Sequence, residues 1–414
     1  QGDPVLVELI AAAQAVSPTV SNALARIENA RANQAAARSA LLPEVNAELS
    51  ASRSQQALTP QGNLVQAGFK ASWELDLVGA NRAVSRAAVA QVEGSRARWH
   101  DARVSVAAEV ANLYYAQASC MQLIKVAEQD AASRRETTRL ADISTQAGFT
   151  APATAALARA SAAESNSRLV QQTAQCDLNT KALVALTGLP ETTLRSKLAT
   201  AFAKGALAQP IAVSSVPAQT ITQRPDVFAA ERDVLVAAAA VGSAKAQRYP
   251  RLMLNGSIAA ARLGNNGTDF SDSIWSIGPL TLSLPLFDGG QRVAAVQSSE
   301  AAYHSSITAY QATVRQAVRE VEEALVTLQS TEARTKEAVV SVQGYAESLT
   351  ATQQRYEQGF ASLMELEDAR RMALAAQSTQ LALQTQRNQA WVSLYRALGG
   401  GFEAKAGTET AQTP

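Results

Sequence analysis

The sequence is poor in the residues that compact globular domains and enzymes use most. Its 414 residues include 13 prolines, 21 glycines and only 5% aromatic residues, which is unlike a series of linked globular domains. The two histidines, His100 and His304, lie in predicted long helices where no Cys/His/Asp cluster has the spacing of metal ligands. We also find no nucleophile arrangement and no phosphate-binding loop. We therefore expect a protein that is not an enzyme and holds neither a metal nor a cofactor.

Strong charge and long apolar runs are absent as well. Lys and Arg number 37 against 36 Asp and Glu, so the net charge of +1 predicts no nucleic-acid partner. No window approaches the roughly 18 uninterrupted apolar residues of a membrane-spanning helix. A start at Gln1 is typical of a mature or trimmed chain, so the sequence does not show whether a signal peptide or a lipid-bearing cysteine was removed. If this protein crosses a membrane, we expect strands to do so.

The clearest positive feature is an internal duplication. At an offset of about 207 to 212 residues, the prolines and glycines of the first half fall on those of the second half. The matched pairs are Pro18 and Pro225, Pro43 and Pro250, Gly79 and Gly289, and Gly148 and Gly359. The duplication predicts a first repeat over 1–188, a linker over 189–220, a second repeat over 221–400 and a tail over 401–414.

Each repeat has the same predicted order of elements. A first helix, at 10–42 in the first repeat, is followed by two segments with period-two alternation, at 45–52 and 65–75. The second repeat has its strand pair at 251–261 and 275–286, less cleanly patterned. The proline-free segments 79–148 and 289–359 predict helices of about 100 Å. Shorter helices, 151–188 and 362–399, follow, so we expect long antiparallel helical hairpins and four strands of roughly 10 residues each.

The two cysteines are placed symmetrically about a predicted turn. Cys120 lies 28 residues before Gly148, and Cys176 lies 28 residues after it. In a helical hairpin that turns at Gly148, the two sulfurs would lie at the same height on adjacent helices, which makes a disulfide geometrically plausible. Such a bond would indicate an oxidising compartment such as the bacterial periplasm. The alternative is a pair of buried thiols that act as small apolar side chains.

The alternating strands suggest a membrane pore. Phe69 and Trp73 lie on the apolar face of the second strand, and Lys70 and Glu74 lie on the other face. Four strands cannot close a barrel, and open strand edges are not tolerated in hydrocarbon, so three copies with twelve strands are predicted. Phe69 and Trp73 would then face lipid. The alternative is a soluble sandwich of two hairpins whose apolar faces pack together.

Several motifs resemble those of the outer-membrane efflux protein family, the TolC/OprM-like outer-membrane factors, over nearly the whole chain. They are QRPDV at 223–227, WELDLVG at 73–79 and PLFDGG at 285–290. The resemblance implies a homotrimer with a 12-stranded β-barrel in the bacterial outer membrane, a long periplasmic α-barrel and an equatorial collar that includes 189–220. It also implies a tripartite pump, with a periplasmic adaptor and an inner-membrane transporter, most commonly of the RND type, as partners.

The resemblance places a gate at the hairpin turns. In the second hairpin, Asp368 and Arg371 match constriction residues, and Met364 is a candidate apolar ring. Three copies of Asp368 would form an acidic ring that favours cations. The alternative is an ordinary surface ion pair at spacing i,i+3. Thr154 stands where the first hairpin commonly has an acidic residue, so no gate is carried over there. The predicted adaptor-docking or turn residues are Gly148, Ala151, Gly359 and Ser362.

The predicted function is an outer-membrane channel for small molecules such as drugs or toxic compounds. Two alternatives remain open at this point. A type I protein secretion duct would differ in its inner-membrane partner rather than in its fold. A soluble periplasmic coiled-coil adaptor or scaffold would need neither trimeric closure nor lipid-facing strands.

Overall fold

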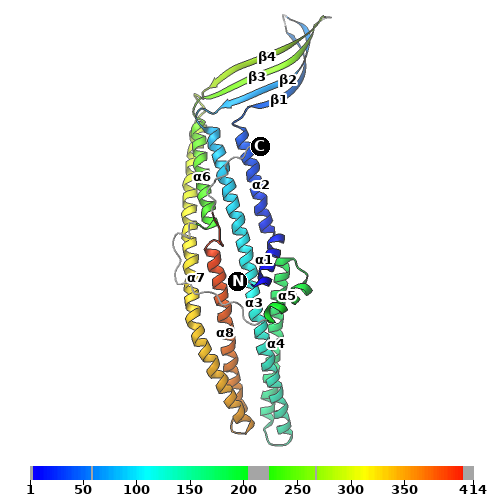
Figure 1. Ribbon diagram of the computed structural model, residues 1–414, viewed down its shortest axis with the longest axis vertical. Helices are drawn as coiled ribbons and strands as arrows, with labels where there is room; N and C mark the ends of the chain where they lie inside the picture. Colours follow the sequence, from blue (N-terminus) through cyan, green and yellow to red (C-terminus); the bar gives the residue numbers. More distant parts are fainter. Residues whose placement is uncertain (1–2, 57–58, 204–222, 266–267, 404–414) are drawn as a thin grey trace. The chain divides into compact units, whose positions relative to one another are not determined.

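The computed structural model describes residues 3–56, 59–203, 223–265 and 268–403, and it is mainly helical with one four-stranded sheet (Figure 1). This confirms the predicted fold class. The elements, in chain order, are α1 (Pro4–Val16), α2 (Pro18–Ser39), β1 (Glu44–Gln56), β2 (Thr59–Leu75), α3 (Ala80–Gln146), α4 (Pro152–Thr187), α5 (Glu191–Ala203), α6 (Pro225–Ala246), β3 (Arg251–Asn265), β4 (Thr268–Ser283), α7 (Gln291–Glu357) and α8 (Leu363–Ala397). Most of the predicted linker over 189–220 and of the tail over 401–414 lies outside the described residues.

The prediction of one helix over 10–42 is wrong, because the chain forms two helices that meet at Ser17. Ser17 has extended backbone angles, and its side chain accepts a hydrogen bond from the Val20 amide at 3.4 Å. Pro18 then opens α2, where its missing N–H group is not needed. No single helix of the described residues is long and apolar enough to span a membrane, although α1 and α2 taken together as a bent pair have such a length and composition.

The two long helices have the predicted lengths and begin in the same way. α3 and α7 each contain 67 residues, which corresponds to about 100 Å at 1.5 Å per residue. Asp76 accepts hydrogen bonds from the Arg82 amide at 2.9 Å and from its Nε at 3.2 Å. Asp288 accepts from the Arg292 amide at 3.1 Å and from its guanidinium at 2.8 Å. The two halves therefore start their long helices with the same carboxylate–arginine contact.

The sheet is antiparallel throughout, in the order β1-β2-β3-β4. One apolar row crosses all four strands through Ala47, Phe69, Ile258 and Trp275. The adjacent row is polar and contains Asn46, Lys70, Ser257 and Ser276. Successive residues of a strand point to opposite faces, so the sheet has one apolar and one polar face at this level.

The strands differ from their predicted bounds. They contain 13, 17, 15 and 16 residues rather than roughly 10, because pairing extends into the polar ends of each hairpin. β4 begins at Thr268 and ends at Ser283, whereas the alternation predicted 275–286. Pro285, which has no amide hydrogen to pair in a ladder, follows its end.

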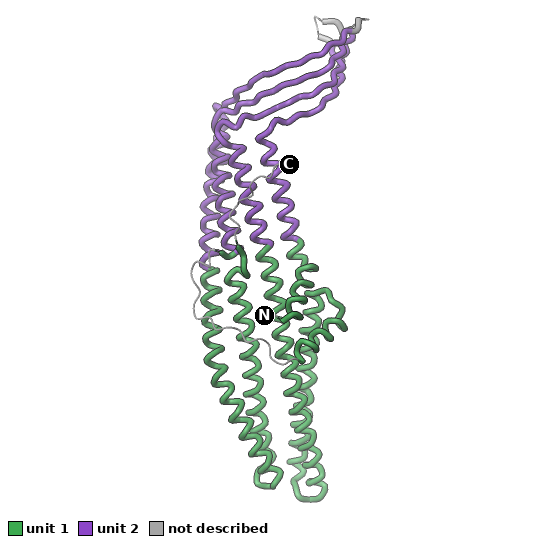
Figure 2. Tube along the Cα trace, viewed as in Figure 1, with its two compact units in different colours: residues 1–21, 100–224, 316–405 green, residues 22–99, 225–315, 406–414 purple. Residues whose placement is uncertain are grey.

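The chain divides into two compact units (Figure 2). Unit 1 contains residues 1–21, 100–224 and 316–405, and unit 2 contains residues 22–99, 225–315 and 406–414. Each unit draws on both halves of the sequence, and the division into repeats stays a prediction.

The main core of unit 1 joins α1, α3, α4 and α5. Leu9, Tyr114, Leu183 and Leu194 have no exposed surface and form one cluster. The Tyr114 hydroxyl contacts the carboxylate of Asp3, which also caps α1 by accepting from the Val5 amide at 3.0 Å. This core lies at the end of the α3–α4 hairpin that is remote from its turn at Gly148. The turn itself belongs to the candidate site.

Candidate functional site at the hairpin ends

Both helical hairpins of unit 1 turn through a glycine followed by an exposed phenylalanine. Gly148 and Gly359 have positive φ angles of 78° and 80°, a conformation that L side chains rarely adopt. Phe149 and Phe360 follow them and are 87% and 72% exposed. The two turns also form equivalent backbone hydrogen bonds, from Phe149 to Ser144 at 2.9 Å and from Phe360 to Arg355 at 2.7 Å. The duplicated sequence thus produces two similar apolar tips.

The other two predicted docking residues start the helices that follow the turns. Ala151 precedes α4 without a side-chain cap. Ser362 caps α8, and its hydroxyl accepts from the Glu365 amide at 3.2 Å. The Glu365 carboxylate accepts in return from the Ser362 amide at 2.6 Å, which completes a capping box. These hydrogen bonds hold the pKa of Glu365 below its usual value. The first turn of α8 therefore has side-chain capping hydrogen bonds, which the first turn of α4 lacks.

The three predicted gate residues lie together on an exposed face of α8. Met364 is 64% exposed, and the side chains of Asp368 and Arg371 are 60% and 69% exposed. Asp368 and Arg371 form an ion pair one helical turn apart. An exposed pair of this kind contributes only a few tenths of a kcal/mol to stability. No described residue of unit 1 therefore buries these side chains, and they are available to a further surface.

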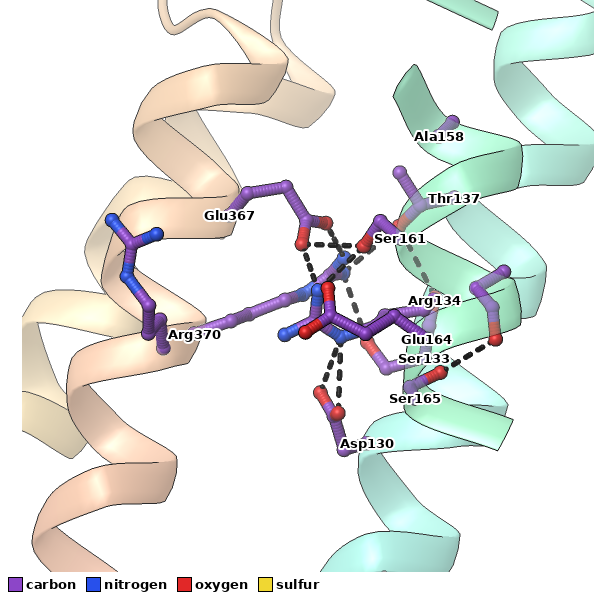
Figure 3. Close-up of polar contacts among 12 residues, drawn as sticks. Asp130, Ser133, Arg134, Thr137, Ala158, Ser161, Glu164, Ser165, Glu367 and Arg370 are labelled. Carbon is purple, nitrogen blue, oxygen red and sulfur yellow. Dashed lines mark hydrogen bonds and ion pairs between the residues drawn. The ribbon is translucent and has the colours of Figure 1, made fainter. Parts of the chain in front are cut away.

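A buried charge network lies beside this exposed face, and the sequence did not predict it (Figure 3). Its centre is Arg134 of α3, whose side chain is 5% exposed. The Arg134 Nε donates to both carboxylate oxygens of Asp130, at 2.9 and 3.0 Å. Its other end contacts Ser161 of α4 and the carboxylate of Glu367 of α8. One guanidinium therefore connects three helices.

A second arginine completes the network from the side of α8. Arg370, whose side chain is 5% exposed, donates to Glu367 at 3.0 Å. It also donates to the hydroxyls of Ser133 and Thr137 on α3, both at 2.9 Å. The Ser161 hydroxyl donates to Glu367 at 2.7 Å. Two arginines thus meet two carboxylates, so that the buried charges balance.

Apolar contacts surround the network. Leu363 and Leu366 of α8 are 4% and 1% exposed and pack with Ala141 and Ala158. Tyr356 of α7 packs on the same cluster, and burial raises the pKa of its hydroxyl, with the charges of Arg370 and Glu367 acting in opposite directions. A buried ion pair gives little net stability, but removal of one partner leaves the other charged and unpaired.

One sequence signal could have indicated this network. Leu363, Leu366, Arg370 and Ala373 recur at helical spacing and are all buried. An arginine within such a stripe needs a buried partner. The sequence predicted Asp368 and Arg371 as gate residues, and both are exposed. Glu367 and Arg370 lie one residue earlier, have the same i,i+3 spacing and are on the buried side of α8.

The remaining predicted residues lie elsewhere in the chain. Cys120 and Cys176 form a disulfide between α3 and α4 with a Cα–Cα distance of 5.6 Å. On the sheet, Phe69 is 57% exposed. Trp73 is half-buried, and its Nε1 donates to the Leu41 carbonyl at 3.1 Å. Within the described residues, no group of three or more His, Cys, Asp or Glu could hold a metal ion.

Comparison with known proteins identifies the family. The family model described as "Outer membrane efflux protein" matches residues 9–189 and 216–400, most of both halves of the chain. The chain belongs to the outer membrane efflux protein family. Members of this family are channels, not enzymes, and they form the outer-membrane part of tripartite efflux pumps.

Three similar proteins show how far the likeness extends. The pyoverdine export outer membrane protein OpmQ of Pseudomonas putida is 29% identical, and the match covers 98% of this chain and 88% of OpmQ. The outer membrane protein OprJ of Pseudomonas aeruginosa is 29% identical over 91% of this chain and 80% of OprJ. The crystal structure of the outer membrane protein VceC of Vibrio cholerae matches with a TM-score of 0.83 at 26% identity, covering 96% and 97% of the two chains. The chain is thus similar to these outer membrane proteins along almost its whole length.

Proposed function

We propose that three copies of this outer membrane efflux protein close one channel, with a 12-stranded β-barrel in the outer membrane and a helical barrel in the periplasm. The observation that carries the proposal is the sheet, whose outer strands β1 and β4 end a four-stranded order. Open strand edges are not tolerated in hydrocarbon, so strands that enter a bilayer need further copies to close them. The apolar row through Phe69 and Trp275, which are 57% and 70% exposed, supplies the lipid-facing side.

The proposed partners follow from the family. A periplasmic adaptor would dock on the hairpin tips around Gly148, Ala151, Gly359 and Ser362, beside the exposed Phe149 and Phe360. An inner-membrane transporter, which we propose to be of the RND type, would supply the energy, so the chain itself needs no catalytic group. OpmQ is named for pyoverdine export, and we propose small molecules as the cargo here as well. The disulfide supports a periplasmic location of the α3–α4 hairpin.

The proposed gate consists of Met364, Asp368 and Arg371. Three copies would bring three carboxylates to one narrow level of the channel, with Arg371 beside each of them. Like charges that converge on a narrow opening attract cations and repel one another, so the neighbouring arginine limits the cost of the ring. This ring requires three copies, since each chain contributes one Asp368 carboxylate.

Labelling of single-cysteine variants tests the proposed function. The variants Phe69→Cys and Lys70→Cys place a thiol on opposite faces of β2, in a background in which the native cysteines are replaced by serine. In trimers reconstituted into liposomes, we expect a lipid-soluble maleimide to label position 69 and a water-soluble maleimide to label position 70. Equal labelling of both positions by the water-soluble reagent would contradict the barrel.

A further inference from the structure

The buried network and the proposed gate occupy two faces of the same turns of α8. The buried face carries two leucines and two charged residues, Leu363, Leu366, Glu367 and Arg370. The exposed face carries the gate residues, Met364, Asp368 and Arg371. Successive residues of a helix are about 100° apart, so the centres of the two faces are roughly 115° apart around the helix axis. The contacts that hold the buried face of α8 in place therefore also determine the direction in which the gate residues point.

We propose that Glu367 and Arg370 are positioning residues that fix the rotation of α8 about its own axis and thereby aim the gate residues into the channel. This inference rests on the proposed function, in which Asp368 lines a constriction of the trimer. It assigns to the network a role in setting the aperture, although its own side chains are buried and touch no cargo.

The contacts that Glu367 makes outside α8 come from two neighbouring helices, α3 and α4, as a rotational anchor requires (Figure 3). One oxygen accepts from Ser161 of α4 at 2.7 Å and contacts Arg134 of α3. The other oxygen accepts from Arg370 at 3.0 Å. Hydrogen bonds to charged groups depend on direction, so turning α8 about its axis breaks the contacts with Ser161 and Arg134 together, while the bond to Arg370, which lies on α8 itself, turns with the helix. Apolar packing is non-directional and would allow the helix to turn with less loss.

Arg370 restrains the same helix independently. It donates to the hydroxyls of Ser133 and Thr137, which lie four residues apart on α3, at 2.9 Å each. Residues four apart lie on one face of a helix. The guanidinium of Arg370 therefore bridges two hydroxyls one turn apart on α3, and a rotation of α8 in either direction moves it sideways, away from both.

A modest rotation is enough to change a constriction. A helix with its side chains has a radius of 5 to 6 Å, so a rotation of about 30° displaces a side-chain tip by about 3 Å. In a threefold ring, all three carboxylates of Asp368 would move together. A shift of this size is comparable to the diameter of a water molecule and would change both ion conductance and cation selectivity.

The experiment is single-channel recording of the purified full-length trimer in planar bilayers. Glu367→Ala removes the carboxylate that lies between the two arginines, and Asp368→Ala removes the proposed ring itself. The matched control is Glu164→Ala, because Glu164 is 65% exposed and pairs with Arg168 within α4. Glu367→Gln is the conservative variant, since it keeps one oxygen acceptor. Each trimer is first checked for assembly, and the conservative variant replaces Glu367→Ala if the latter does not assemble.

The proposal predicts that Glu367→Ala lowers cation selectivity by at least about half of the Asp368→Ala change, with a smaller change for Glu367→Gln and none for Glu164→Ala. In the double variant, Glu367→Ala should add little to Asp368→Ala, because both act through the same ring. A purely structural role would lower the melting temperature and leave selectivity unchanged.

The other outcomes separate this inference from the proposed function. If Asp368→Ala alters selectivity while Glu367→Ala behaves like the control, the positioning role is refuted and the gate stands. If neither variant alters selectivity, the gate assignment fails and the inference fails with it. If the wild-type protein forms no conducting channel, the proposed function itself is contradicted.

Discussion

Loss of the disulfide should loosen the first helical hairpin and leave the second one unchanged. Cys120 and Cys176 are separated by 56 residues, and their bond joins α3 to α4. In the chain-entropy description, cross-linking a loop of this length destabilises the unfolded chain by about 4 kcal/mol at 25 °C. The α7–α8 hairpin has no cysteine, so it provides an internal control within the same molecule.

The assay is amide hydrogen exchange on the assembled wild-type protein and on the Cys120→Ser/Cys176→Ser variant. An opening that separates α3 from α4 should become easier by up to about 4 kcal/mol, or close to a thousandfold in exchange rate. Faster exchange is expected around residues 115–180, and the rates of α7 and α8 should not change. Equal rates in α3 and α4 with and without the bond, or faster exchange in both hairpins alike, would refute the reasoning.

Three further changes have defined outcomes. In urea denaturation, Glu367→Ala should lower the free energy of unfolding by about 3 to 5 kcal/mol, because it leaves the buried Arg370 without a carboxylate partner, whereas the exposed Asp368→Ala should lower it by less than about 1 kcal/mol; similar costs would contradict the burial argument. Gly68→Val should reduce assembly, because a Cβ there would lie 2.3 Å from a carbonyl oxygen of β3, while Gly62→Ala, with 3.8 Å of space, should assemble normally on a native gel. The backbone amide of Arg292, at the start of α7, holds the pKa of Asp288 below its ordinary 3.8. The Asp288 carboxylate therefore stabilises the fold above pH 3.8, and this stabilisation is lost as the pH falls through the lowered value. Melting curves of Asp288→Asn should show a weaker acid dependence than those of the wild type, and an unchanged dependence would exclude the contact.

The lengths and turns of the long helices could be read from the sequence. Proline and glycine mark their ends in both halves, and the absence of proline over 69 residues predicts α3 and α7 closely. The equal spacing of Cys120 and Cys176 from Gly148 was informative for the same reason, because a regular hairpin converts equal chain distances into equal heights. Period-two alternation likewise located the four strands.

The features that the sequence did not reveal depend on how helices face one another. The break at Ser17 carried a sequence signal that the prediction did not use, because Pro18 directly follows it and starts α2. The buried network was missed because Glu367 and Asp368 are adjacent acidic residues, and only the rotation of α8 decides which of them is buried. Helical spacing indicates which of the two acidic residues shares a face with buried residues. The partner of Glu367, Arg134, nevertheless lies 233 residues away in the sequence.

The central claim is that one chain supplies a third of a closed channel. Electron cryo-microscopy of the detergent-solubilised wild-type protein tests it most directly. The account predicts threefold particles in which β1 of one protomer pairs with β4 of its neighbour. Monomeric particles, or a sheet whose row through Phe69 packs inside a single chain, would contradict it.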